Sequence, residues 1–247
     1  MSKEQRVALV TGSSSGIGAA VARRLAAAGV RVVVNSANSV EAGEKLAADL
    51  PDAVYVRANV ADEADAKRLV QAAVDTYGRL DILVNNAGIT RFIDHGDFEA
   101  ASPEVWREIN EVNVIAAWQT TVAAIEHLKA DGGGSVVNVS SQAGIYANGS
   151  SIPYAVSKAA LNHMTRLLAK QLGPVGVRVN AVAPGLIDTP WYNGLEGMDK
   201  AMEEVAERLP MRRVGTAEDI AEAVCDLANA SYITGEVLLV DGGGHLL

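Results

Sequence analysis

Short runs of β-branched residues alternate along the whole chain with longer segments rich in Ala, Leu and Glu. Most of these runs are continuously apolar, as is typical of strands buried on both faces of a parallel sheet. The expected strands are 7–10, 30–34, 54–56, 82–84, 136–139, 177–182 and 237–240. The segments between them have the length and period of helices, and they are 17–28, 40–50, 62–77, 103–130, 154–173 and 216–229. The alternation predicts an α/β fold with βαβ crossovers, a Rossmann-type doubly wound sheet of seven parallel strands with helices on both faces.

The organisation of the chain indicates a single domain. Its 247 residues, 49% of them hydrophobic, are enough to bury a sizeable core. No linker, low-complexity tract or repeat divides residues 1–247. Segment 191–213 interrupts the alternation after the sixth expected strand and carries Gly194 and Gly197. Because insertions at the carboxyl end of a strand often cover a site, we expect a substrate lid at 191–213, with an ordinary surface helix as the alternative.

The composition argues against several classes of partner. The formal net charge of -9 disfavours nucleic acid and anionic membranes, and 4% aromatic residues are too few for a base-stacking surface. Cys225 is the single cysteine, and the four histidines are scattered, so we expect neither an intramolecular disulfide nor a metal site. No apolar run approaches the roughly 18 residues that span a bilayer. Since Met1–Arg6 also lacks the pattern of a secretory signal, we expect a cytoplasmic protein.

A glycine-rich turn follows the first expected strand and opens a helix. Its sequence, Thr11–Gly18, has the spacing G-x-x-x-G-x-G instead of the common G-x-G-x-x-G fingerprint. Glycines at such a turn let the backbone approach a pyrophosphate, and the helix N-terminus supplies free N–H groups and partial positive charge. In the first unit of a doubly wound sheet, this turn predicts dinucleotide binding.

The end of the second expected strand bears on the choice of cofactor. Dinucleotide-binding folds that prefer NAD(H) place an acid there for the ribose hydroxyls, but Asn35–Ser39 contains neither Asp nor Glu, and Glu41 is the first acid. Nor does this stretch contain Arg or Lys to pair with a 2′-phosphate. Neutral Asn35 and Ser36 can still donate hydrogen bonds to a phosphate, more weakly than a cation. The stretch therefore favours NADP(H), with NAD(H) as the alternative.

Tyr154 and Lys158 lie four residues apart at the start of an expected helix, and therefore on one face of it. A free phenol has a pKa near 10 and is a poor base at neutral pH. A neighbouring ammonium would favour the phenolate and lower that pKa. Tyr154 could then exchange a proton with a substrate hydroxyl as general acid or base. The alternative is a packed Tyr beside a solvated Lys.

Small and polar residues follow three more expected strands. They are Asn85–Gly88 after the fourth strand, Asn138–Gly144 after the fifth, and Pro184–Gly185 with Ile187 and Thr189 after the sixth. Doubly wound folds bind their ligands at the carboxyl ends of the strands. We therefore expect these segments, the glycine turn and Tyr154 to meet in one crevice.

In this order and spacing, the motifs resemble those of the classical short-chain dehydrogenase/reductase family, from about Val7 to Gly243. The resemblance rests on T-G-x-x-x-G-I-G at 11–18, N-N-A-G at 85–88, Y-x-x-x-K at 154–158 and P-G at 184–185. It implies hydride transfer between a nicotinamide and a carbonyl or secondary alcohol. A non-catalytic protein that senses the dinucleotide is the alternative of another class.

The resemblance also implies roles for individual residues. The family's catalytic Ser lies 13 residues before its Tyr, which selects Ser141. Tyr154 would be the proton donor or acceptor, and Lys158 would bind the nicotinamide ribose and lower the pKa of the phenol. Asn113, in preference to Asn110, would hold a water on a proton path from the lysine. The residues expected to contact the cofactor are Gly12, Ser14, Ser15, Ile17, Gly18, Asn35, Ser36, Asn59, Val60, Asn86, Ala87, Gly88, Tyr154, Lys158, Pro184, Gly185, Ile187 and Thr189.

The substrate side is expected to be apolar and able to form hydrogen bonds, lined by Gln142, Tyr146, Ile93, Trp191 and Tyr192. The sequence looks most like bacterial 3-oxoacyl-carrier-protein reductases and related carbonyl and sugar reductases. With a net charge of -9, docking of an acidic acyl-carrier protein is weakly supported, and a small-molecule ketone or alcohol is the main expectation. Family resemblance further implies a homotetramer that pairs the long helices 103–130 and 154–173 across one two-fold axis and the C-terminal strand across another.

Overall fold

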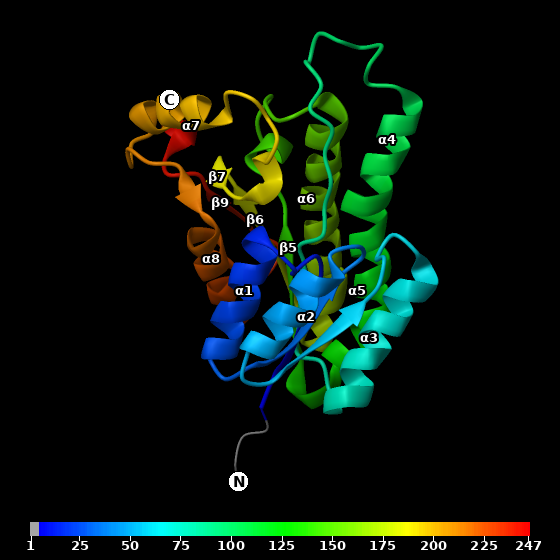
Figure 1. Ribbon diagram of the computed structural model, residues 1–247. Helices are drawn as coiled ribbons and strands as arrows, with labels where there is room; N and C mark the ends of the chain where they lie inside the picture. Colours follow the sequence, from blue (N-terminus) through cyan, green and yellow to red (C-terminus); the bar gives the residue numbers. More distant parts are fainter. Residues whose placement is uncertain (1–4) are drawn as a thin grey trace.

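The computed structural model describes residues 5–247 and contains a seven-stranded parallel sheet, which confirms the predicted doubly wound architecture (Figure 1). Residues 1–4 of the predicted N-terminal segment lie outside the described residues. The strand order is β3-β2-β1-β4-β5-β6-β9. The strands are β1 (Val7–Val10), β2 (Arg31–Ser36), β3 (Ala53–Arg57), β4 (Ile82–Asn85), β5 (Ser135–Val139), β6 (Arg178–Pro184) and β9 (Val237–Val240).

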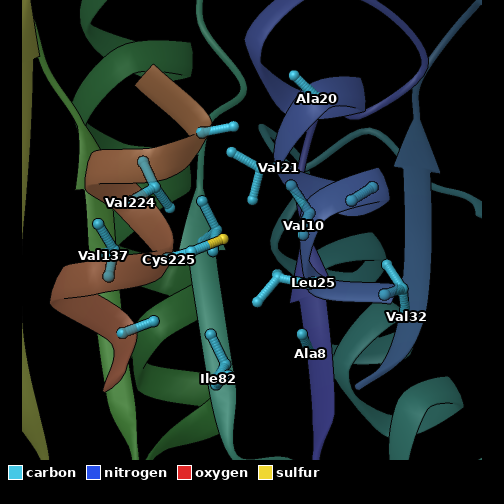
Figure 2. Close-up of a cluster of buried hydrophobic side chains, with 14 of the residues drawn as sticks. Ala8, Val10, Ala20, Val21, Leu25, Val32, Ile82, Val137, Val224 and Cys225 are labelled. Carbon is cyan, nitrogen blue, oxygen red and sulfur yellow. The ribbon is translucent and has the colours of Figure 1, made fainter. Parts of the chain in front are cut away.

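Helices cover both faces of this sheet. One face is covered by α1 (Gly16–Ala27), α2 (Val40–Asp49) and α8 (Ala217–Asn229). The other face is covered by α3 (Glu63–Tyr77), α5 (Ala116–Leu128) and α6 (Ile152–Leu172). Figure 2 shows the first layer, where Val224 of α8 lies over Val137 of β5 and Leu25 of α1 lies near Val10 of β1. Strands β1, β4 and β5 are wholly buried between the two layers, which explains their largely apolar sequences.

The segment predicted as one helix over 103–130 is interrupted. It consists of α4 (Pro103–Asn110), a π-helical turn η1 (Glu111–Ile115) and α5. Single π turns inside helices often occur at functional sites, and this one contains Asn113. The interruption was not visible in the sequence because a π turn retains the apolar spacing of a helix to within one residue.

The segment after β6 leaves the main sheet. Strand β7 (Ile187–Asp188) pairs in parallel with β8 (Gly215–Thr216) in a separate two-stranded sheet, and α7 (Met198–Arg208) lies between them in the chain. Strands of two residues are too short to be recognised from periodicity. Helix α7 has no buried residue, and Figure 1 shows it beyond the carboxyl ends of the main strands.

Short helices occur at several of the connections, and they are η2 (Ala130–Gly132), η3 (Gln142–Gly144), η4 (Gly173–Val175), η5 (Pro190–Tyr192) and η6 (Gly244–Leu246). Within residues 5–247, no helix is both long and apolar enough to cross a membrane. The strand order reverses between β1 and β4, since β1 is followed in the chain by β2 on one side and has β4 on the other. A doubly wound sheet has its ligand crevice at such a reversal.

Candidate active site

A cavity of about 910 Å³ lies over the carboxyl ends of the strands. Most of the residues predicted for the site line it together. They are Gly12, Ser15, Ile17, Asn35, Ser36, Asn59, Val60, Asn86, Ala87, Gly88, Ser141, Gln142, Tyr154, Lys158, Pro184, Gly185, Ile187, Thr189, Trp191 and Tyr192. The predicted residues that do not line it are Ser14, Gly18, Ile93, Asn113 and Tyr146. Tyr146 is 40% exposed and lies outside the cavity, so its predicted contact with substrate has no support in this geometry.

The glycine turn forms one end of this cavity. Gly12 has a φ of +61°, and a Cβ there would lie 2.9 Å from the Ala87 Cα. Gly16 also has a positive φ, +54°, just where α1 begins. The turn is thus a bare backbone surface at a helix N-terminus, and it fits the pyrophosphate of a dinucleotide. Gly18 serves packing, because a Cβ there would lie 2.5 Å from the Asn86 Nδ2.

Asn86, just after β4, holds the glycine turn in place. Its Nδ2 donates to the carbonyl oxygens of Thr11 and Gly12 at 3.0 and 2.9 Å. In return, the Thr11 hydroxyl accepts the backbone N–H groups of Asn86 and Ala87 at 3.0 and 3.1 Å. The two strand ends are therefore joined by four hydrogen bonds, and the turn is preformed.

Asn35 and Ser36 line the cavity, but their polar atoms already have partners. The Asn35 Oδ1 accepts the Gly12 N–H at 3.2 Å, and its Nδ2 donates to two backbone carbonyls at the end of β3. The Ser36 hydroxyl bonds to the Tyr55 hydroxyl at 2.9 Å and to the Ser39 carbonyl at 3.1 Å. These side chains fix the shape of the loop, and the expectation that they donate to a phosphate has no support in this geometry.

Ser141, Tyr154 and Lys158 meet at the other end of the cavity. Ser141 follows β5, while Tyr154 and Lys158 lie one turn apart on α6. The Lys158 Nζ lies 5.7 Å from the centroid of the Tyr154 ring and donates to the Val139 carbonyl at 2.9 Å. The helix begins just before them, where the Ser151 hydroxyl accepts the Tyr154 N–H. The predicted i, i+4 pair therefore does face one site.

Burial controls the protonation of this pair. Desolvation raises the pKa of Tyr154 to about 12, the Ser141 side chain opposes this shift, and the neighbouring Tyr192 adds to it. Desolvation also lowers the pKa of Lys158 to about 8. The net shift of the phenol pKa in the protein alone is therefore upward, and the expected lowering by the ammonium stays a prediction. The physical reason for the upward shift is the loss of solvent around the buried phenol.

Asn113 lies behind the cavity wall, in the π-helical turn. Its Oδ1 accepts the Ile89 N–H at 2.8 Å, and its Nδ2 donates to the Ile89 carbonyl and to the Ser157 hydroxyl, both at 3.0 Å. A Cβ added to Gly88 would lie 3.3 Å from the Asn113 Oδ1 and 3.5 Å from the Lys158 Nζ. Asn113 therefore borders the same small space as the ammonium, which the sequence indicated only through the resemblance.

Asn110, the alternative to Asn113, does not approach this space. Its Nδ2 donates to the Trp106 carbonyl within α4 at 2.8 Å. The two asparagines differ because the π turn rotates the chain between them.

Aromatic side chains form the wall opposite the glycine turn. The Phe92 and Tyr192 rings have centroids 6.1 Å apart, and so do the Tyr154 and Trp191 rings. These four are a large share of the chain's 3 Trp, 6 Tyr and 2 Phe. Phe92 was missed by the sequence analysis. Its position a few residues after the N-N-A-G strand end was the only available signal.

Comparisons with known proteins agree with this geometry. A protein-family model described as enoyl-(acyl carrier protein) reductase matches residues 12–245. The chain is 65% identical over 244 residues, 99% of this chain and 98% of the relative, to the "Granaticin polyketide synthase putative ketoacyl reductase 2" of Streptomyces violaceoruber. It is 39% identical over 249 residues to a 3-oxoacyl-[acyl-carrier-protein] reductase of Thermotoga maritima, covering 98% of this chain and 99% of the relative.

A solved structure has the same fold over the whole chain. It is described as "Crystal structure of a putative short-chain dehydrogenase/reductase from Burkholderia xenovorans". It is 36% identical in sequence and superposes with a TM-score of 0.91, and the match covers 99% of this chain and 100% of the Burkholderia chain. The named relatives are reductases and dehydrogenases, which favours an enzyme over the non-catalytic sensor. The chain belongs to the short-chain dehydrogenase/reductase family, oxidoreductases that use NAD(P)(H) and act on CH–OH and C=O groups.

Proposed function

We propose that this enzyme is an NADP(H)-dependent reductase of a ketone carried on an apolar, planar framework, with Tyr154 as the general acid. The observation that carries the proposal is that one cavity joins the bare glycine turn to Ser141, Tyr154 and Lys158. The turn and the walls around Asn59 and Asn86 would hold the cofactor. When bound, its nicotinamide supplies a hydride to the carbonyl carbon.

The protonation of the site suits the reductive direction. With a pKa near 12, the Tyr154 phenol keeps its proton at neutral pH and can give it to a carbonyl oxygen as that oxygen gains charge. Ser141 lies beside the phenol and would donate a second hydrogen bond to the same oxygen. The product is a secondary alcohol, and Tyr154 must then recover its proton from solvent.

Lys158 links the two halves of the proposed site. It is 4% exposed and donates to the Val139 carbonyl, so its ammonium is held in a fixed position in the cavity wall. From there it would bind the nicotinamide ribose. The shared space of Lys158, Gly88 and Asn113 supports a water-mediated path that returns a proton towards the phenol.

The substrate class follows from the aromatic wall. Aromatic side chains favour contact with a further flat ring, and Trp191 and Tyr192 both line the cavity, each tilted against a neighbouring ring. The relative at 65% identity is named as a ketoacyl reductase of a polyketide synthase, whose substrates carry ketones. We include residues 191–213 in the proposal as a lid over this substrate end, since α7 has no buried residue and Leu195, Met198 and Val205 line the cavity.

A second candidate is reduction of a 3-oxoacyl group on an acyl-carrier protein. Relatives at 39% and 37% identity carry that name. The catalytic groups would serve either substrate, and the net charge of -9 disfavours docking of an acidic carrier.

Oxidation of NADPH by a substrate panel tests the proposal. The panel contains a bicyclic aryl ketone, a short aliphatic ketone, a 3-oxoacyl thioester and the same acyl group on a carrier protein. We expect the highest kcat/KM with the bicyclic ketone. A preference for the carrier-bound substrate of tenfold or more would establish the second candidate instead, and binding of NADPH without any turnover would remove both.

A substitution in the loop after β2 tests the choice of cofactor separately. Ala37→Asp places a carboxylate where the loop has none, so it adds a ribose acceptor and a like charge against a 2′-phosphate. We expect the wild type to bind NADPH more tightly than NADH, and the variant to reverse this order. A wild type that prefers NADH by tenfold or more contradicts the proposal.

We further propose a homotetramer with two kinds of two-fold contact. Apolar side chains are exposed on both long helices, Trp118 and Val122 on α5 and Leu167 on α6, at 47%, 43% and 53%. Leu238 on the edge strand β9 is 42% exposed. Isologous pairing of both surfaces closes a tetramer. Light scattering at micromolar concentration measures its mass, and a monomer would end this part of the proposal.

A further inference from the structure

The adenosine end of the cavity has no charged side chain from the loop that follows β2. Asn35 and Ser36 are both bonded within the protein, and Ala37 has no polar side chain. Asn38 and Ser39 are exposed and neutral. If the enzyme distinguishes the two cofactors by charge, the charge must therefore come from outside this loop.

Arg57, the last residue of β3, reaches this loop from the neighbouring strand. It is paired with Ser36 in the parallel register, and its Nε donates to the Ala37 carbonyl at 3.1 Å. Its side chain is exposed and forms no ion pair within 4.0 Å among the described side chains of residues 5–130 and 132–247, although the charge of Asp65 acts on it at longer range. By contrast, the nearby Arg68 forms an ion pair with Asp65 at 2.8 Å.

We propose that Arg57 recognises the 2′-phosphate of NADP(H). The bond from Nε to Ala37 fixes the side chain against the loop and leaves the two Nη groups to bind a phosphate. The N-terminus of α2, which begins at Val40 directly after the loop, adds partial positive charge on the same side. The one opposing group in that first turn is the exposed Glu41.

This inference rests on the proposed use of NADP(H), but not on the proposed substrate. Arginine could also stack on the adenine ring, which NADH and NADPH share. The two roles differ in one respect only, which is whether the effect of losing Arg57 depends on the 2′-phosphate.

The experiment is an equilibrium titration of the full-length protein with NADPH and NADH, followed by protein fluorescence. The probes 2′,5′-ADP and 5′-AMP repeat the comparison by calorimetry without a nicotinamide. For Arg57→Met we expect the Kd of NADPH and of 2′,5′-ADP to rise roughly tenfold to a hundredfold, as for a lost charge-assisted hydrogen bond. The Kd of NADH and of 5′-AMP should change less than twofold. Arg57→Lys should recover part of the lost affinity for NADPH, because lysine retains the positive charge but lacks the planar guanidinium that binds two phosphate oxygens.

Lys67→Met is the matched control. Lys67 lies on α3, is exposed and pairs with Glu63, so its loss changes the net charge equally without touching the loop. It should leave all four Kd values unchanged. Melting temperatures of all variants check that each remains folded.

Three results overturn the inference. They are equal weakening of NADH and NADPH by Arg57→Met, no weakening of either, and a wild type that binds 2′,5′-ADP no more tightly than 5′-AMP. In each case turnover of the substrate panel by the wild type separately decides the proposed function, since hydride transfer needs only the nicotinamide end.

Discussion

The floor and the roof of the cavity are held in different ways. The floor is formed by the ends of β4 and β5 with α6, and a buried polar chain lies beneath it. Asn85 donates to Thr121 of α5 and to Asn138 of β5, and Asn138 donates to Thr165 of α6, all at 2.9–3.0 Å. The roof is η5 and α7, and α7 has no buried residue and begins after glycines with positive φ.

From this difference we expect the floor to determine the rate of the chemical step and the roof to determine which substrates bind. Buried polar side chains that are hydrogen-bonded to one another hold their neighbours in a fixed geometry, as proton transfer requires. A segment with few buried contacts opens at low free-energy cost, as substrate entry requires. Changes to the floor should therefore lower kcat, and changes to the roof should mainly raise KM.

The largest effect is expected at Lys158. Lys158→Met removes the ammonium that would bind the ribose and take part in the water-mediated proton path. The substitution keeps most of the side-chain volume. Both cofactor affinity and turnover should fall, with kcat/KM lowered on the order of 10³-fold or more. Steady-state kinetics with a cofactor titration measure this, and Lys170→Met, at the exposed end of the same helix, is the control. Full cofactor affinity in Lys158→Met would contradict ribose binding by Lys158, and an unchanged kcat would contradict the role of the floor.

Tyr154→Phe should affect turnover alone. The variant loses one oxygen and keeps the ring that packs against Trp191. We expect kcat to fall by ~10²–10⁴-fold, as for loss of a general acid, with little change in the Kd of the cofactor. Tyr146→Phe is the matched control, because that residue is exposed and outside the cavity. If the Tyr154 variant retains most of its turnover, the proton comes from elsewhere.

The buried ammonium should also be visible in the stability of the free protein. Burial lowers the pKa of Lys158 to about 8, whereas in the unfolded chain it is about 10.4. Between these values the unfolded state binds more protons, so the free energy of unfolding rises with pH.

Urea unfolding of wild type and Lys158→Met across this range measures the effect. The wild type should gain on the order of 2–3 kcal/mol relative to the variant as pH rises from about 8 to about 10. A difference between the two proteins that does not depend on pH would show that the ammonium is solvated.

The smallest effect is expected on the roof. Trp191→Ala removes the ring that faces Tyr154 but leaves the floor intact. We expect the KM of a bicyclic ketone to rise about three- to tenfold, in line with the loss of one aromatic contact, while kcat changes little. The KM of a short aliphatic ketone should hardly change, and Phe98→Ala, 75% exposed and outside the cavity, is the control. A fall in kcat as large as that of Tyr154→Phe would mean that roof and floor are not separate.

Residues that act through local spacing were predictable. The Tyr154–Lys158 pair depends only on the helical period, and the glycine turn depends on a strand followed by a helix. Strands β1, β4 and β5 were found because burial on both faces requires largely apolar runs, whereas the edge strands β3 and β9 are only partly buried and were found from their β-branched residues. By contrast, the π turn around Asn113 and the two-residue strands β7 and β8 are too short to leave a period in the sequence.

Covalent connectivity and residue type thus determined the doubly wound fold and the set of strand ends that meet at one crevice. The reason is that parallel strands place all their carboxyl ends at the same edge of the sheet. Only the tertiary structure decided what those side chains do there. It turned Asn35 inward to support Gly12, brought Arg57 to Ala37 across two paired strands, and raised the pKa of Tyr154 by burial. Each of these depends on contacts between segments distant in the chain and on the exclusion of water, and neither is encoded in local spacing.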